Sequence, residues 1–376
     1  MTLRTTISVF QTIALCSSSY FPVVFWFFPS IAVEHAKFDA QWSVLLVAIV
    51  GVGIAWLYGA LNERFPNITG ADVHVMVSGR WLGKVILVAY IPVYLLFLAL
   101  SLYFTVNLMK YFFPDTPQAV FAIFICVVGW RGAWLGIEAL GRVASIVHPL
   151  TFAGLIASFV MVYFRAERHL IPHQLVNTMN VVQATYHLLP LYLGMNLFVM
   201  LSPYYNHAKR KSIWYPIISA IIGGVVLCIV FLSTVINLGW EPITKVMYPL
   251  QMTIQLIRLQ GFLIERLGIV ILILSVAFGT LFVSNHIWAL STVVARILDR
   301  TDDAYKPFTP LVVVLMFLGY TFIRNPVQAR ELVEDYLTPV SVILLIVVPG
   351  LELLIAKIRG MRTDRASQST RQKNQT

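Results

Sequence analysis

The chain has 376 residues, of which 59% are hydrophobic and only 12% are charged. A soluble domain has roughly half apolar and about a quarter charged residues, so this composition excludes a soluble enzyme or scaffold and indicates an integral membrane protein. The net charge of +10 does not indicate a nucleic-acid partner, because most of the basic residues fall in loops on one side of the apolar segments.

Ten apolar segments are long enough to cross a hydrocarbon layer of about 30 Å. They are predicted at residues 5–33, 40–62, 84–112, 117–136, 143–165, 184–205, 212–238, 264–296, 308–325 and 335–358. Of the 27 lysines and arginines, 18 lie on the side of the two chain ends and 9 on the other side. The positive-inside rule therefore places both termini in the cytoplasm.

We expect one transmembrane domain over residues 1–360 and a disordered, polar cytoplasmic tail over 361–376. The domain divides into halves at about 1–165 and 184–358. Each half has five spans, and because five is odd the halves cross the membrane in opposite directions. The expected fold is all-α, with ten transmembrane helices in a five-plus-five inverted repeat.

The first span is interrupted in its middle by polar residues and a proline. A helix in lipid must satisfy its backbone groups internally, so such a break is tolerated where protein or a cavity receives the freed groups. The expected ligand-binding residues here are Ser17, Ser18, Ser19, Tyr20 and Pro22. The alternative is that the serines bond to carbonyls of their own helix or pack against a neighbour.

The third and fifth spans contribute further candidates. Tyr94 and Ser101 are seven residues apart on one face of the third span, where they either contact a ligand or pack against other helices. Glu138 and Arg142 stand four residues apart before the fifth span. We expect them to form a structural ion pair.

The sixth span is interrupted at residues 189–196, which matches the break in the first span. Pro190 removes a backbone donor, and Gly194 permits close approach of another segment. Asn196 can donate and accept hydrogen bonds, so it could hold a ligand amide, carboxylate or hydroxyl. The alternative is a proline kink, with Asn196 bonded to a neighbouring helix.

The eighth span offers Phe278 and Phe282, an aromatic pair four residues apart that either lines the ligand site or packs in the core. Glu265 and Arg266 stand at its start, and we expect a structural role for them. In the tenth span, Glu352 is expected to reach the headgroups or pair with Lys357. We expect no catalytic residue, no metal site and no cofactor, because the spacings typical of those sites do not stand out.

Several short motifs together resemble the endospore germination permease family, the B subunits of spore nutrient receptors. Those that carry the resemblance are Phe10-Gln11 with Pro29, Arg64-Phe65-Pro66, Trp81-Leu82-Gly83-Lys84, Asp115-Thr116-Pro117, Gly136 to Arg142, Leu193-Gly194-Met195, Tyr248-Pro249 and Phe262 to Leu267. The resemblance covers most of residues 1–295. Three places depart from the family pattern: Pro22-Val23-Val24 replaces small residues, Asn196 stands where a glutamate is common, and Gly268 stands where an aspartate or glutamate is common.

The resemblance implies the fold of the amino acid–polyamine–organocation superfamily and residence in the spore inner membrane. It further implies a complex with a membrane-bound A subunit and a lipoprotein C subunit, and a small nutrient such as an amino acid as the ligand. We therefore expect a germinant-sensing subunit that binds its ligand near the bilayer midplane. The alternatives are a secondary transporter of amino acids or related solutes, which uses the same site, and an intramembrane enzyme, for which the serines lack a nearby base.

Overall fold

The computed structural model describes residues 6–20, 23–165, 177–204, 213–256, 267–300 and 302–363. Within these ranges the regular elements are all helices. Eight helical segments are long and apolar enough to cross a membrane: Phe28–Arg64, Arg80–Phe112, Gln118–Leu135, Ile137–Ala157, Trp214–Leu238, Leu272–Ile297, Ala304–Phe322 and Pro326–Ile358. The first and sixth predicted spans are not continuous helices, and they complete the ten-span arrangement.

The first span consists of two short helices separated by irregular backbone. Helix α1 (Val9–Ser17) begins at a capping box formed by Ser8 and Gln11, and helix α2 (Phe28–Ala36) begins with a proline in its first turn. The interruption was predicted at residues 16–22. Residues 18–20 and 23–27 lie outside both helices, so the helix resumes later than predicted, and Pro22 lies outside the described residues.

The sixth span changes its helical type where the break was predicted. Helix α8 (Thr178–Leu188) leads into the 3₁₀ segment η3 (Leu189–Asn196), followed by the short helix α9 (Leu197–Met200). Pro190 lacks the N–H that an α-helical bond to the preceding turn requires, which explains why the tighter 3₁₀ pattern starts there. The backbone of this span is therefore irregular over the same residues that the sequence singled out.

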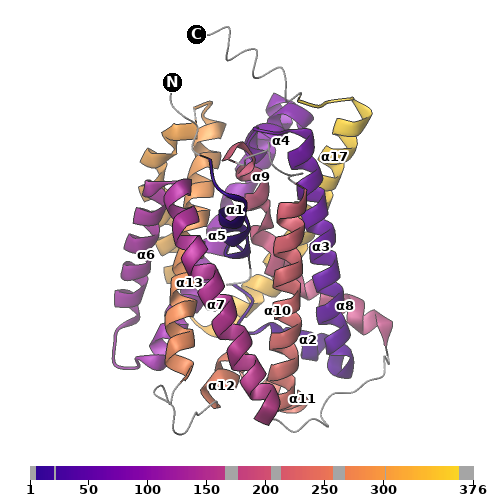
Figure 1. Ribbon diagram of the computed structural model, residues 1–376. Coiled ribbons are helices and arrows are strands. Elements are labelled where there is room, and N and C mark those ends of the chain that lie inside the picture. The colour runs from indigo at the N-terminus through magenta and orange to yellow at the C-terminus, as the bar shows by residue number, and fades with distance from the viewer. Residues whose placement is uncertain are drawn as a thin grey trace.

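The other spans surround these two interrupted segments. Their helices are α3 (Ala40–Arg64), α5 (Arg80–Phe112), α6 (Gln118–Leu135), α7 (Ile137–Arg165), α10 (Trp214–Leu238), α13 (Leu267–Ile297) and α14 (Thr309–Phe322). Helix α1 contacts α7 and α10, and α3 packs along α10. Helices α3 and α10 are the second spans of the two halves. In Figure 1, α1 lies inside the bundle with its starting end on the side where α17 ends. We call this the terminal side.

The tenth span is not a regular α-helix. It runs through α15 (Pro326–Glu331), the π-helical turn η6 (Leu332–Leu337), α16 (Thr338–Val342), a second π-helical turn η7 (Ile343–Val347) and α17 (Val348–Ile358). π-helical turns inside helices are frequent at functional sites. The carbonyl of Leu344 in η7 accepts a hydrogen bond from the Tyr58 hydroxyl at 3.0 Å, which ties the tenth span to α3.

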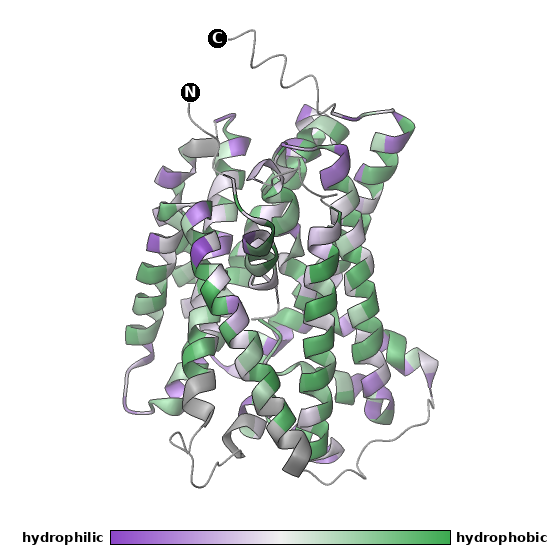
Figure 2. Cartoon of the chain, in the orientation of Figure 1, coloured by the Kyte–Doolittle hydropathy of each residue, from purple (hydrophilic) through white to green (hydrophobic). Residues whose placement is uncertain are grey.

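Short helices lie at both ends of the bundle. Helix α4 (Gly70–Ser78) is on the terminal side (Figure 1). Helices α11 (Trp240–Lys245) and α12 (Pro249–Leu256) are at the opposite side. Figure 2 shows that hydrophobic residues dominate the long helices between these ends, as a bilayer requires.

Candidate functional site

The two interrupted segments pack directly against each other. A Cβ atom added to Gly194 would lie 1.5 Å from the backbone oxygen of Ser19, a distance that no side chain can occupy. Glycine at position 194 therefore lets the 3₁₀ segment of span six touch the irregular segment of span one. This contact leaves no room for a ligand between Gly194 and Ser19.

The serine hydroxyls of the first break form hydrogen bonds to span one itself and to span seven. The hydroxyls of Ser18 and Ser19 both donate to the carbonyl of Leu15, each at 2.7 Å. The hydroxyl of Ser17 lies 2.8 Å from that of Ser219 on α10, and the Tyr20 hydroxyl donates to the Ser219 carbonyl at 2.6 Å. These five hydroxyl side chains are all fully buried. The break is therefore stabilised by hydrogen bonds within span one and by hydrogen bonds to span seven.

Asn285 on α13 crosslinks the eighth span to the first break. Its Nδ2 donates to Ser19 Oγ at 2.9 Å, to Ser18 Oγ at 3.1 Å and, at 3.4 Å, to the carbonyl of Leu15. The side chain is fully buried, and its Oδ1 has no hydrogen-bond partner among the described residues. This amide oxygen could accept a hydrogen bond from a donor group of a ligand.

His286, the next residue, presents a second unpartnered atom. Its Nδ1 lies 3.0 Å from the carbonyl of Phe282, and because a carbonyl only accepts, Nδ1 must carry the proton in the neutral ring. The buried Nε2 is then an acceptor, and it has no partner among the described residues. It is 3.1 Å from the position of an added Cβ on Gly194, beside the contact between the breaks.

The third span reaches the same place through an aromatic cluster. The Tyr94 hydroxyl donates to the carbonyl of Leu193 at 3.1 Å, a group in the irregular part of span six. The ring of Tyr94 stacks on His286, with centroids 6.1 Å apart, and Phe282 lies 4.2 Å from His286. The structure thus brings Tyr94 and Phe282 together with both breaks.

The remaining candidates occupy other places. Ser101 is buried on α5, and its Oγ has no partner among the described residues. Phe278 lines a separate cavity of about 40 Å³ with Trp26 and Thr105, away from the terminal side of the breaks. Pro190 is buried at the start of η3.

The charged pairs expected to be structural have different outcomes. Arg142 forms an ion pair with Glu138 within α7, and both side chains are largely exposed. Glu265 and Arg266 lie outside the described residues.

A cavity of about 40 Å³ opens on the terminal side of the contact between the breaks. It is lined by Asn196, Tyr94 and His286 from the site, and by Tyr58, Tyr90, His74 and Glu352 from surrounding helices. This volume admits about three water molecules and is too small for an amino acid. The breaks and their neighbours must therefore move apart before a ligand of that size can enter.

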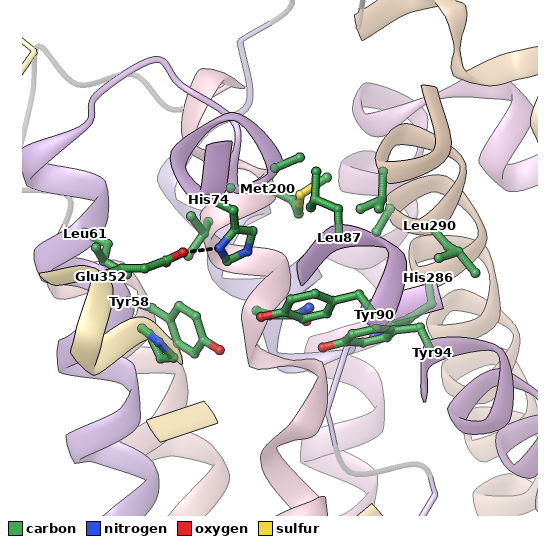
Figure 3. A pocket seen from close by; sticks show the side chains of 17 residues that line it. Tyr58, Leu61, His74, Leu87, Tyr90, Tyr94, Met200, His286, Leu290 and Glu352 are labelled. Carbon is green, nitrogen blue, oxygen red and sulfur yellow. Dashed lines mark hydrogen bonds and ion pairs between the residues drawn. The ribbon is translucent and has the colours of Figure 1, made fainter. Parts of the chain in front are cut away.

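His74 and Glu352 form a buried polar contact at this cavity. Figure 3 shows the two side chains pointing toward each other, with the rings of Tyr90 and Tyr94 nearby. His74 Nδ1 is hydrogen-bonded to Glu352 Oε1, and the Glu352 side chain is only 3% exposed. The interpretation of Glu352 as a partner of Lys357 or of headgroups was therefore wrong, and a buried carboxylate does lie near the breaks.

Sequence reasoning passed over His286 and the pairing of His74 with Glu352. A histidine directly after an asparagine inside a strongly apolar span is itself a signal, because polar residues at membrane depth are costly and usually functional. No local pattern could have paired His74 with Glu352, which are 278 positions apart.

Comparisons with known proteins identify the family of this chain. The spore germination protein family matches residues 6–328. Spore germination protein KB of Bacillus subtilis (strain 168) is 24% identical over 76% of this chain and 78% of its own length. Putative spore germination protein YfkT of the same organism is 23% identical over 89% of this chain and 91% of its own length.

Two solved structures share the fold at low sequence identity. MhsT in complex with L-phenylalanine has a TM-score of 0.67 and 12% identity, covering 94% of this chain and 89% of the other. A nucleobase–cation symport-1 family transporter, closed with bromovinylhydantoin bound, has a TM-score of 0.61 and 10% identity, covering 91% and 78%. The predicted fold class, an all-α membrane protein of ten transmembrane helices in a five-plus-five inverted repeat with broken first and sixth helices, is confirmed. The family and the fold are those of permeases or receptors rather than enzymes. This integral membrane protein belongs to the spore germination protein family.

Proposed function

We propose that this chain is the germinant-sensing B subunit of a spore nutrient receptor, with its ligand site where the breaks of spans one and six meet. The observation that carries the proposal is the pair of unpartnered, buried acceptors, Asn285 Oδ1 and His286 Nε2. Buried acceptors without partners cost free energy, so their presence in the centre of a membrane bundle favours a ligand that supplies the missing donors.

The chemistry of these atoms favours a ligand that carries N–H or O–H groups. An ammonium, amide or hydroxyl could donate to both acceptors, and the neighbouring Asn196 offers a further amide. A carboxylate on the ligand would meet backbone N–H groups freed at the breaks. A small amino acid or a related polar nutrient fits this description, even though Asn196 replaces the carboxylate common in the family.

The closed contact between Ser19 and Gly194 explains how binding would become a signal. Because the cavity is too small for such a ligand, binding favours an arrangement in which spans one and six separate. That change would be passed to an A subunit and a lipoprotein C subunit in the spore inner membrane, with both termini of this chain in the cytoplasm. Co-purification of these subunits with the tagged chain from spores tests the partners.

A secondary transporter is the second candidate, and the buried pair His74–Glu352 is the observation that favours it. Ionisable residues at membrane depth often belong to proton or ion pathways, and this pair lines the same cavity as Asn196. Purified chain in proteoliposomes distinguishes the two functions. Nutrient uptake that depends on a proton gradient and is lost in Glu352→Gln supports a transporter, whereas binding without uptake supports a receptor.

Germination of spores that carry His286 variants tests the site. Loss of one hydrogen bond to a ligand costs about 1–3 kcal/mol, equivalent to roughly a 5- to 150-fold shift of the nutrient dose–response. We expect this shift for His286→Leu and partial recovery for His286→Gln, which retains an acceptor. The matched control is His148→Leu, because His148 is also buried but stacks on Phe152 outside the terminal-side cavity. Equal responses of His286→Leu and the control, across a nutrient panel, would remove His286 from the site.

A further inference from the structure

Three side chains of the types that bind transition metals meet on the side opposite the terminal side. They are His35 from α2, His187 from α8 and Glu334 from the π-helical turn η6, and one donor atom of each lies within 4.8 Å of the others. His35 Nε2 is 3.4 Å from Glu334 Oε2, and His187 Nδ1 is 4.0 Å from the same oxygen. The two imidazole rings are parallel, with centroids 3.9 Å apart.

These distances are close to those of a tetrahedral zinc site. Ligands placed 2.0–2.1 Å from a tetrahedral Zn²⁺ are about 3.4 Å from one another. The pair His35–Glu334 already has this separation, and His187 needs to approach by only about 0.6 Å. Two histidines and one carboxylate, with the fourth position left to water, form a common zinc ligand set.

His187 provides an independent indication of a missing ligand. Its Nδ1 atom is buried and has no hydrogen-bond partner among the described residues. A proton on His35 would serve the contact between His35 and Glu334 but would leave this nitrogen unsatisfied. A metal ion between the three residues would satisfy both imidazoles at once after one ring rotates, because the in-plane lone pairs of two parallel rings do not converge on one point.

The surrounding charges orient Glu334 and leave room for a cation. Arg330 Nε binds Glu334 Oε1 at 2.5 Å, so the other oxygen faces the histidines. Arg330 also pairs with Glu34 through both terminal nitrogens. With neutral histidines, the two carboxylates and one guanidinium sum to −1, and the exposed Asp335 adds a further negative charge nearby. Such outer partners hold metal ligands in place and tune the site.

An ion can reach this cluster from the aqueous side. The side chains of His35, His187 and Glu334 are 17–21% exposed, so none is sealed in the core. Arg330 also lines a cavity of about 190 Å³ together with Lys245 and Tyr248, near helix α11.

We propose that His35, His187 and Glu334 bind one divalent transition-metal ion, with Zn²⁺ as the best fit. The bound ion would join the outer part of span one to the outer part of span six and to span ten. These are the parts that must separate if the breaks open toward this side. The proposal departs from the expectation of no metal site and does not depend on the proposed germinant site.

Zinc titration of the full chain tests the proposal. The protein is purified in nanodiscs without a histidine tag, and zinc competes against a chromophoric chelator. We expect one zinc per chain, and a loss of affinity of at least ~10- to 100-fold in Glu334→Gln and His187→Asn. The matched control Glu241→Gln removes an exposed carboxylate paired with Lys245 and should bind as the wild type does. Mg²⁺ should not compete, because it prefers six oxygen ligands.

Chemical modification of the unmutated protein provides a second readout that does not depend on how variants fold. Diethyl pyrocarbonate reacts with histidines, and mass spectrometry maps the modified sites. Zinc should protect His35 and His187 and should leave His74, on the terminal side, unaffected. If zinc protects neither residue, or if the variants bind zinc as tightly as the wild type, then the cluster is only a histidine–glutamate contact and the proposal is wrong.

Discussion

Replacement of Gly194 by alanine should force the two broken spans apart. The new Cβ would lie 1.5 Å from the Ser19 carbonyl oxygen and 2.5 Å from its carbonyl carbon. These are backbone atoms of the opposite segment, so no side-chain rotation relieves the overlap. Because a carbon–oxygen contact normally requires about 3.3–3.6 Å, one segment must shift by roughly 2 Å.

The free-energy cost follows from the packing of this region. Overpacking of a filled core costs typically ~1–3 kcal/mol and sometimes more, and we expect the upper end because Ser19 is held by its bond to Leu15 and by Asn285. At about 2 °C per kcal/mol for a large domain, the thermal midpoint should fall by about 5 °C or more. Gly53→Ala is the matched control, since an added Cβ there meets nothing within 4 Å on an exposed face of α3.

Thermal unfolding of the two variants in the same detergent measures this difference. Gly53→Ala should have an unchanged or slightly raised midpoint, because alanine is the better helix former by up to ~1 kcal/mol. In spores, Gly194→Ala should alter the nutrient dose–response and Gly53→Ala should not. Equal midpoints and equal responses for both variants would show that the breaks are not in contact, and the arrangement proposed for the site would be wrong.

Two further predictions concern polar contacts around the breaks. Asn285→Leu removes the donor that bridges span eight to both serines and should cost about 1–3 kcal/mol in thermal stability. Asn107→Leu, which loses a bond to its own helix and a long, exposed bond of 3.4 Å from Gln118, should cost less, and a reversed order would contradict the bridging role. Replacing His74 or Glu352 alone by leucine should cost about 3–5 kcal/mol by leaving one buried partner. Replacing both should recover most of that loss, and additive losses in a double-mutant cycle would argue against direct coupling.

The two breaks could be predicted because their causes are local. Pro190 lacks a backbone donor and stands in the first turn of the 3₁₀ segment η3, which begins at Leu189. The hydroxyls of Ser18 and Ser19 compete for the carbonyl of Leu15, and α1 ends at Ser17. The sequence could not predict that residues 23–27 also lie outside a helix, because these residues are apolar and carry no helix-breaking signal.

The partners of the polar residues depend on how distant segments pack. Asn285 reaches Ser19 across 266 positions, and His74 reaches Glu352 across 278. Single-sequence periodicity reports which face of a helix is apolar, but it does not report which other helix that face meets. Lys357 was expected as the partner of Glu352 because both residues are on one helix. In the structure, Glu352 is buried and its partner is His74 on α4.

The metal cluster and the contact between the breaks lie on one connected segment. His187 is on α8, which continues directly into η3 and Gly194. If Gly194→Ala pushes η3 away from span one, α8 should shift with it, and His187 should leave the position that zinc binding requires. Zinc affinity should therefore be lower in Gly194→Ala than in Gly53→Ala. Binding linkage is reciprocal, so zinc should raise the thermal midpoint of the wild type more than that of Gly194→Ala. Equal zinc affinities in the two alanine variants would mean that the cluster and the breaks act independently.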